Sequence, residues 1–203
     1  MRLVLDWDGT VTERDTLEAL VERFGDIETY RRTGRLMGRS LTHDEALARS
    51  VATVRAPLDE VVGWLVDTVR LRRGFRELVE RHRPLVVSSG FHELIEPVLA
   101  RERVAVELLA NRVEARPEGW RIRFRDQIRC SDCREPCKRA SLPPGEVMYV
   151  GDGYSDRCAA LAATRVFATD RLAHYLDERA IPYTPFSDLH DVLRALSPEA
   201  VAR

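Results

Sequence analysis

The spacing of hydrophobic residues changes several times along the chain. A short apolar run, Leu3 to Leu5, stops at the polar segment from Asp6 to Thr10, as expected of a buried strand followed by a turn. From residue 15 to residue 71 the apolar positions recur at helical spacing, beginning with Leu17, Leu20 and Val21. This pattern predicts about four helices and no strand, which is typical of a compact helical insert.

Two helix-start signals support the predicted insert. The segment Thr42-His43-Asp44-Glu45 has the form of a capping box, in which a threonine and a glutamate satisfy free backbone groups at a helix N-terminus. Pro57 stands where the first turn of a helix tolerates proline, ahead of an apolar run at residues 61–69.

Strands and helices alternate after residue 74. Helices are predicted at 75–81, 93–101 and 155–163, strands at 84–87, 104–109, 147–150 and 166–168, and a hairpin across 113–124 that turns at 117–119. Alternation of this kind indicates an α/β fold with a mostly parallel sheet and helices on both faces. We therefore expect residues 1–12 and 74–203 to form the α/β core, and residues 13–73 to form a helical cap inserted after the first strand.

Composition narrows the possible partners and the compartment. The 203 residues carry 32 basic and 33 acidic side chains, a net charge of -1, so there is no overall positive field to attract nucleic acid. No apolar run is long enough to cross a membrane, and the acidic residues near the N-terminus leave no room for a signal peptide. We expect a soluble cytoplasmic protein, monomeric or homodimeric, that binds neither nucleic acid nor membrane. Only one basic residue, Lys138, is a lysine.

Three of the four cysteines lie close together in the sequence. Cys130, Cys133 and Cys137 form this cluster, and Cys158 stands apart. In a reducing compartment such a cluster indicates metal or redox chemistry more often than a structural disulfide. Structural Zn²⁺ normally takes four ligands. Three interpretations stay open: a structural metal site, a reversible disulfide, or inert thiols, with Cys158 either a fourth ligand or a small core residue.

Polar clusters follow three of the predicted strands. They contain Asp6 and Asp8, then Ser88-Ser89-Gly90, then Asp152 and Asp156. The carboxyl ends of parallel strands lie at one edge of a sheet, which is where such sheets bind ligands. Carboxylates gathered at one point repel one another unless a cation lies between them, and an all-oxygen ligand set favours Mg²⁺. The hydroxyl of Ser88 and the open backbone at Gly90 suit phosphate oxygens.

These residues resemble the four ordered motifs of the haloacid dehalogenase-like phosphatase superfamily: Asp6-x-Asp8-Gly9-Thr10, Ser88, Lys138 and Gly151-Asp152-x-x-x-Asp156. The helical insert after the first motif is similar to the four-helix cap of the branch that includes the phosphoserine phosphatases. The resemblance implies a Rossmann-like core and Mg²⁺-dependent hydrolysis of a small phosphorylated metabolite through an aspartyl-phosphate.

Residue roles follow from the same resemblance. Asp6 would be the nucleophile, and Asp8 the acid and base. Mg²⁺ would be held by Asp6, the main-chain carbonyl of Asp8 and Asp152, with Asp156 either a further ligand or a residue behind the ligands. Lys138 and Ser88 would hold the phosphoryl oxygens, beside Gly90. The family commonly has glycine where this chain has Ser89, which leaves open which serine makes the contact.

The identity of the leaving group is tied to Asp15. Phosphoserine phosphatases usually have glutamate at this position, where it meets the amino group of the substrate. Asp15, together with the cysteine cluster before Lys138, is more similar to the methionine-salvage phosphatases that act on 2-hydroxy-3-keto-5-methylthiopentenyl-1-phosphate. Three alternatives remain: a phosphoserine phosphatase, a phosphotransferase that uses the same site, and a zinc-organised scaffold without activity.

Overall fold

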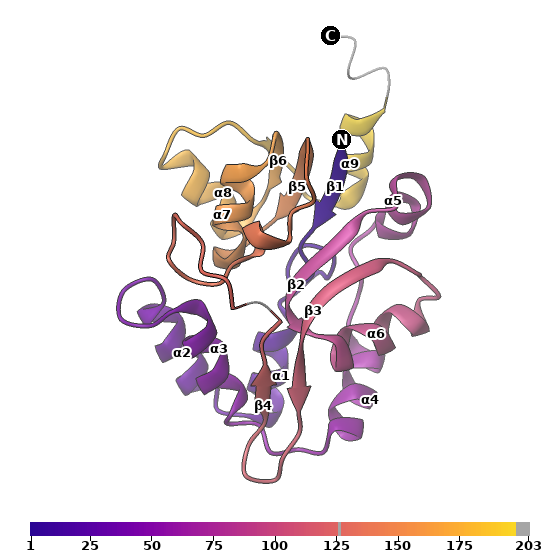
Figure 1. Cartoon of the computed structure of the whole chain (residues 1–203). Helices are drawn as coiled ribbons and strands as arrows, with labels where there is room; N and C mark the ends of the chain where they lie inside the picture. Colours follow the sequence, from indigo (N-terminus) through magenta and orange to yellow (C-terminus); the bar gives the residue numbers. More distant parts are fainter. Residues whose placement is uncertain (126, 198–203) are drawn as a thin grey trace.

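The fold is built on one seven-stranded sheet. The computed structural model describes residues 1–125 and 127–197, and its strands lie in the order β4-β3-β2-β1-β5-β6-β7 (Figure 1). All neighbouring strands pair in parallel except β3 and β4, which are antiparallel. The bounds are β1 (Arg2–Leu5), β2 (Leu85–Phe91), β3 (Glu107–Glu114), β4 (Arg121–Arg123), β5 (Val147–Gly151), β6 (Arg165–Ala168) and β7 (Thr184–Pro185). The predicted α/β fold is confirmed.

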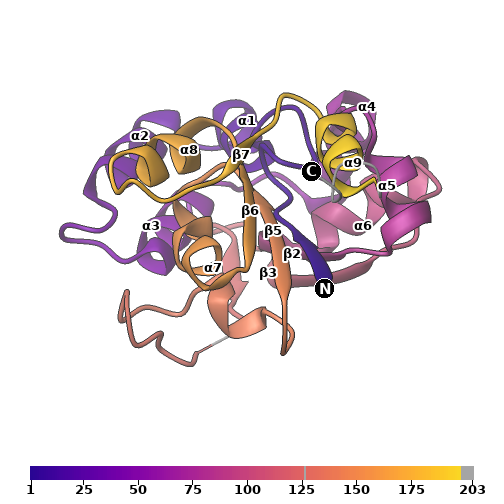
Figure 2. The ribbon, with the colours of Figure 1, turned by 90° about the horizontal axis from the view of Figure 1, so that it is seen from above.

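Helices cover both faces of the sheet because its central strands are apolar on both sides. Val4 and Tyr149 point into one cluster, which the helices α7 and α8 complete, whereas Leu3 and Leu5 point into the other, which α5, α6 and α9 complete. Figure 2 shows these two layers on either side of the strands. The bounds are α5 (Phe75–His82), α6 (His92–Arg101), α7 (Arg157–Ala162), α8 (Asp170–Asp177) and α9 (Leu189–Leu196).

Four helices between β1 and α5 form the cap. They are α1 (Thr16–Phe24), α2 (Ile27–Leu36), α3 (His43–Val51) and α4 (Leu58–Thr68). The side chains of Asp15, Asp26 and Thr42 accept hydrogen bonds from backbone amides at the starts of α1, α2 and α3, and Thr42 and Glu45 form the predicted capping box. The predicted four-helix insert is confirmed. Its division from the core at residues 13 and 73 stays a prediction, and residues 126 and 198–203 of the predicted core lie outside the described residues.

The chain enters and leaves the cap through two segments that lie side by side. Thr12 and Leu71 form an isolated antiparallel bridge. The amide of Arg72 donates to the carbonyl of Val11 at 2.7 Å, and the amide of Glu13 donates to the carbonyl of Arg70 at 3.0 Å. The cap is therefore inserted at a single point, directly beside Asp6 and Asp8.

The β3–β4 hairpin reaches from the core to the cap (Figure 1, lower end). Trp120, in the loop between its two strands, is only 1% exposed. Its indole Nε1–H donates to the carbonyl of Ala56 at 2.9 Å, and its amide donates to the carbonyl of Val54 at 3.0 Å. Gly119 has a φ of +133° and lies so close to the cap that a Cβ there would be 2.2 Å from the carbonyl oxygen of Ala52. The hairpin thus connects the core to the α3–α4 connection.

Three predicted elements differ in their bounds. The strand predicted at 84–87 continues to Phe91, since the polar Ser88-Ser89-Gly90 segment stays extended at the sheet edge. The strand predicted at 104–109 begins only at Glu107 and runs on into the hairpin. The helix predicted at 155–163 is a 3₁₀ turn, η2 (Tyr154–Asp156), followed by α7. Among the described residues, no helix combines the length and the apolar character that crossing a membrane requires.

Candidate active site

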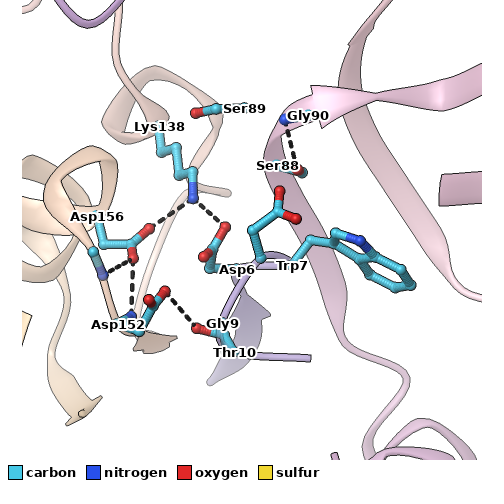
Figure 3. Close-up of polar contacts among 12 residues, drawn as sticks. Asp6, Trp7, Gly9, Thr10, Ser88, Ser89, Gly90, Lys138, Asp152 and Asp156 are labelled. Atoms are coloured by element: carbon cyan, nitrogen blue, oxygen red, sulfur yellow. Dashed lines mark hydrogen bonds and ion pairs between the residues drawn. The ribbon is translucent and has the colours of Figure 1, made fainter. Parts of the chain in front are cut away.

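The predicted site residues meet at the carboxyl ends of β1, β2 and β5. Figure 3 shows Asp6, Ser88, Lys138, Asp152 and Asp156 around one point. A cleft of about 880 Å³ opens there. Its walls come from the sheet edge, the cap helices α1–α3 and the start of α8, and its lining includes Asp6, Asp8, Asp15, Leu17, Tyr30, Met37, Leu47, Ser89, Gly90, Lys138, Asp152 and Arg171.

Lys138 joins two of the carboxylates. It lies in a short 3₁₀ turn, η1 (Lys138–Ser141), and is only 3% exposed. Its ammonium donates to Oδ1 of Asp6, and to Oδ1 of Asp156 at 2.7 Å. Burial alone would lower the pKa of Lys138, but the charges of Asp156 and Asp6 outweigh it and raise the pKa above its ordinary value. The lysine is therefore a fixed positive charge beside Asp6.

Asp156 fixes the loop that follows β5. It is fully buried and accepts four hydrogen bonds, from Lys138 Nζ, from the Tyr149 hydroxyl at 2.7 Å, and from the amides of Asp152 at 3.0 Å and Gly153 at 2.8 Å. These four donors replace the water contacts that the carboxylate loses on burial. Asp156 thereby positions both Lys138 and Asp152.

Asp8 is held from the start of the cap. Its Oδ1 accepts hydrogen bonds from the hydroxyl of Thr16 and from the amide of Thr16, the latter at 3.0 Å. Burial, followed by the nearby charges of Asp15 and Asp6, raises the pKa of Asp8 to about 7. A carboxyl group with this pKa exchanges a proton near neutral pH, as a general acid and base must.

Asp152 lies against the first motif. Thr10 Oγ1 donates to its Oδ1 at 3.2 Å, and a Cβ on Gly9, whose φ is +73°, would lie 2.4 Å from its Oδ2. Glycine is therefore required at position 9. Burial and then the charges of Asp6 and Asp156 raise the pKa of Asp152 to about 10, and burial with the charge of Asp156 raises that of Asp6 to about 6.

The carboxylates have the chemistry of a divalent-cation site. Asp6, Asp152 and Asp156 each offer an oxygen, and these oxygens all lie within 4.8 Å of one another. Such crowding in a buried position is unfavourable for three negative charges, and a cation offsets the repulsion. The donor set contains only oxygen, which fits Mg²⁺.

The second motif brings two serines to the same edge. Ser88 is 3% exposed, and its Oγ accepts a hydrogen bond from the amide of Gly90 at 2.8 Å. This bond leaves the hydroxyl proton of Ser88 free to be donated. Ser89 is half-buried and lines the cleft, and its carbonyl accepts a hydrogen bond from the amide group of Asn111 at 2.8 Å.

Both carboxylate oxygens of Asp15 already have partners. One accepts the amide of Glu18 at 2.9 Å as the N-cap of α1, and the other accepts the hydroxyl of Tyr30 at 3.3 Å. Asp15 lines the cleft, but its first task is to begin α1, which carries Thr16 to Asp8.

The structure brings all four cysteines together. The Sγ atoms of Cys130, Cys133, Cys137 and Cys158 lie within 4.8 Å of one another, and none forms a disulfide. Cys158 is 8% exposed, so it is buried as a core residue would be while its sulfur also lies in the cysteine cluster. The sequence left Cys158 open as either a fourth ligand or a core residue, and the structure places its sulfur beside the other three.

Three supporting residues were not predicted. Thr16 holds Asp8, and Tyr149 holds Asp156. The guanidinium of Arg72 donates to the carbonyls of Gly9 at 2.7 Å and Thr10 at 3.1 Å, which fixes the turn after Asp8. Arg72 follows the last cap helix, far from Gly9 in the sequence, and arginine is too common in this chain to single it out.

Comparisons with known proteins agree with this geometry. Residues 3–161 match the family model of the haloacid dehalogenase-like hydrolases. The chain is 29% identical to a 2-hydroxy-3-keto-5-methylthiopentenyl-1-phosphate phosphatase of Geobacillus thermodenitrificans, over 94% of this chain and 93% of that protein.

Solved structures of phosphoserine phosphatases share the fold. A phospho-aspartyl intermediate analogue superposes with a TM-score of 0.69 at 18% identity, covering 96% of this chain and 98% of that one. An apo form superposes with a TM-score of 0.71 at 15% identity, covering 96% and 98%. With a family model that spans most of the chain and the motif residues gathered at one sheet edge, the chain belongs to the haloacid dehalogenase-like hydrolases.

Proposed function

We propose that this protein is a Mg²⁺-dependent phosphatase that hydrolyses a small phosphomonoester through a phosphorylated Asp6. The observation that carries the proposal is the contact between Asp6 and the buried ammonium of Lys138, with Asp8 two residues further along the same turn. A carboxylate nucleophile needs a nearby cation to accept the charge of a phosphoryl group, and it needs a separate acid for the leaving group.

In the first step a carboxylate oxygen of Asp6 attacks phosphorus. The new O–P bond forms as the ester P–O bond breaks, and the protonated Asp8 gives its proton to the departing oxygen. The Ser88 hydroxyl, oriented by the Gly90 amide, and the Lys138 ammonium bind phosphoryl oxygens. Of the two serines, Ser88 is the one with an oriented proton to donate.

In the second step water attacks the phosphorus of the Asp6 phosphoanhydride. Asp8, now ionised, takes a proton from the water, and the bond between Asp6 and phosphorus breaks to release inorganic phosphate. The Asp6 carboxylate and the protonated Asp8 are thereby restored. Asp6, the main-chain carbonyl of Asp8 and Asp152 would hold Mg²⁺, which supplies positive charge at the phosphoryl group when bound. Asp156, already saturated by four donors, acts behind these ligands.

Replacement of the nucleophile tests this mechanism. We expect Asp6→Asn to reduce turnover of a generic aryl phosphate by at least about 10⁴-fold, because an amide cannot form the phosphoenzyme. Thermal unfolding and circular dichroism should show an intact fold. Turnover within about tenfold of wild type in a clean preparation would overturn the proposal.

We further propose that the leaving group carries a thioether and not an ammonium group, as in 2-hydroxy-3-keto-5-methylthiopentenyl-1-phosphate. Support comes from the relative at 29% identity, from the apolar lining of Leu17, Met37 and Leu47, and from the two hydrogen bonds that already occupy Asp15. The methylthio group would bury its apolar surface against the cap.

A comparison of two substrates tests this choice. We expect kcat/KM for the methylthio substrate to exceed that for phosphoserine by at least about 100-fold, which corresponds to about 2.7 kcal/mol of transition-state binding. An equal or larger kcat/KM for phosphoserine would instead indicate that Asp15 or Glu18 binds the substrate ammonium. Both outcomes leave the role of Asp6 unchanged.

A further inference from the structure

We infer that Cys130, Cys133, Cys137 and Cys158 bind one Zn²⁺ ion, and that this zinc site positions Lys138 in the catalytic cleft. The inference goes beyond the proposed phosphatase function, since it concerns a second metal of different chemistry in a different part of the molecule. It rests on the positions of four sulfur atoms and on the two segments that carry them.

The sulfur atoms lie near the spacing that one metal ion requires. All four Sγ atoms lie within 4.8 Å of one another. Tetrahedral zinc with Zn–S bonds of about 2.3 Å places its sulfur ligands about 3.8 Å apart, so small side-chain movements complete the site. Four thiolates around one tetrahedral ion favour zinc over Mg²⁺ or Ca²⁺, which prefer oxygen.

The loop that carries three of the cysteines is folded as a metal-binding turn. The amide of Asp132 donates to Sγ of Cys130 at 3.4 Å, and the amide of Arg134 donates to the Cys130 carbonyl at 2.9 Å. An amide hydrogen bond to sulfur stabilises a metal-bound thiolate. Arg129 and Pro136 form an antiparallel bridge that closes the loop at its base. The amide of Cys130 also donates to the carbonyl of Glu135 at 2.9 Å, and the Glu135 carboxylate accepts the amide of His43 at 2.8 Å, which joins the loop to the start of α3.

The fourth proposed ligand, Cys158, comes from a different part of the chain, so a metal ion bound here would connect two segments. Cys137 directly precedes Lys138, and Cys158 lies two residues after Asp156. Lys138 and Asp156 are themselves joined by a 2.7 Å ion pair. A zinc ion bound to Cys137 and Cys158 therefore ties together the two segments whose side chains meet beside Asp6. Zinc is structural here, and Lys138 is the catalytic residue that it positions.

Charge at the site is compatible with four thiolates. One Zn²⁺ with four thiolates carries two negative charges, and neighbouring cations offset them. Arg157 directly precedes Cys158 and lines a cavity of about 250 Å³ together with Cys133, Cys137 and Cys158. Its guanidinium is held between the rings of Tyr154 and Tyr175, each 4.4 Å away.

Metal analysis of the whole protein tests the inference without any substrate. We expect about one zinc per chain by mass spectrometry of metals after purification without chelators. Cobalt exchanged into the site should give the sulfur-to-cobalt charge-transfer bands and visible bands of a tetrahedral thiolate centre. Cys133→Ser, at the most exposed ligand, and Cys158→Ser should each remove the metal and the bands. The control Ser131→Ala, in the same loop, should keep both.

Removal of zinc should also affect catalysis in a defined way. We expect kcat to fall by at least about tenfold while binding of Mg²⁺ by the separate carboxylate site persists, because the ammonium of Lys138 is displaced. Zinc-free protein with four freely titrating thiols, an intramolecular disulfide, stoichiometric iron in place of zinc, or full zinc retention in Cys158→Ser would each overturn the inference. None of these results bears on Asp6 phosphorylation, so the two proposals fail separately.

Discussion

Lys138 is the residue whose chemistry is most narrowly specified. The chain has 31 arginines and one lysine. That lysine is only 3% exposed, and its ammonium contacts both Asp6 and Asp156. A guanidinium is planar and much wider, so it cannot replace a compact point charge in this position without moving its neighbours.

We therefore predict that Lys138→Arg lowers kcat by at least about 100-fold although the positive charge is kept. Steady-state kinetics on an aryl phosphate measures the effect. The matched control is Arg139→Lys at the neighbouring, partly exposed position, which should stay within about twofold of wild type. Near-normal kcat in Lys138→Arg would mean that the lysine is a matter of composition and not of chemistry.

The sequence allowed a site residue to be predicted where its neighbours in the chain mark its position. Asp6, Asp8, Asp152 and Ser88 each lie within three residues of the end of an apolar run, so the sheet geometry alone predicts that they converge. Thr16 and Arg72 escaped prediction because each acts across the cap boundary, and a threonine or an arginine at those positions has no distinguishing pattern. Cys158 joins its cluster only through the packing of α7.

At the scale of elements, the β3–β4 hairpin contacts the cap through Trp120 and through the tightly packed Gly119. A side chain at Gly119 would collide with the backbone carbonyl of Ala52, and its φ of +133° is unfavourable for any other residue. Gly145 also has a positive φ, of +91°, but a Cβ there would meet nothing within 4 Å. Comparing alanine substitutions at the two glycines therefore distinguishes the cost of backbone strain, which both share, from the cost of the clash with the cap, which only Gly119 has.

We predict that Gly119→Ala lowers the free energy of unfolding by about 1–3 kcal/mol more than Gly145→Ala does. Urea unfolding followed by circular dichroism gives both values. Equal losses in the two variants would indicate that the hairpin does not press against the cap in solution.

Element boundaries were predictable only where apolar patterning continues to the end of the element. The capping box at Thr42 fixed the start of α3 correctly, because a cap is a local hydrogen-bond signal. The predicted end of β2 was four residues too early, because the apolar run stops at Val87 and the strand continues through the polar residues Ser88 and Ser89 to Phe91. The spacing of apolar residues reflects which side chains are buried, so it does not mark the ends of strands whose last residues are polar.

At the scale of the whole molecule, the carboxylate cluster makes stability depend on pH, and the proposed Mg²⁺ site predicts that it depends on Mg²⁺ as well. The folded-state pKa values of about 6, 7 and 10 for Asp6, Asp8 and Asp152 all lie above the usual value near 3.9. A raised pKa means that the folded state binds protons more tightly than the unfolded state. The stability gained in this way is complete below about pH 4 and is lost as the pH rises through the folded pKa values.

We accordingly predict that saturating Mg²⁺ raises the melting temperature by about 5–10 °C near pH 8, and by clearly less near pH 5.5, where protons compete for the same oxygens. Differential scanning fluorimetry measures the shift. Asp152→Asn, which removes one ligand, should lose most of the Mg²⁺ effect at about pH 8. A shift that is equal at both pH values would contradict the assignment of the cation to these carboxylates.

The paired segments at Thr12 and Leu71 have a consequence for how this architecture varies. Because the chain leaves the core and returns to it across one hydrogen-bonded step, a different insert can rejoin the core at the same two residues, provided that it keeps the contact of Thr16 with Asp8 and a surface for Trp120. We expect such an insertion point to accept exchange of the entire helical insert as a module. Chimaeras joined there would then acquire new leaving-group preferences while the chemistry at phosphorus stays the same.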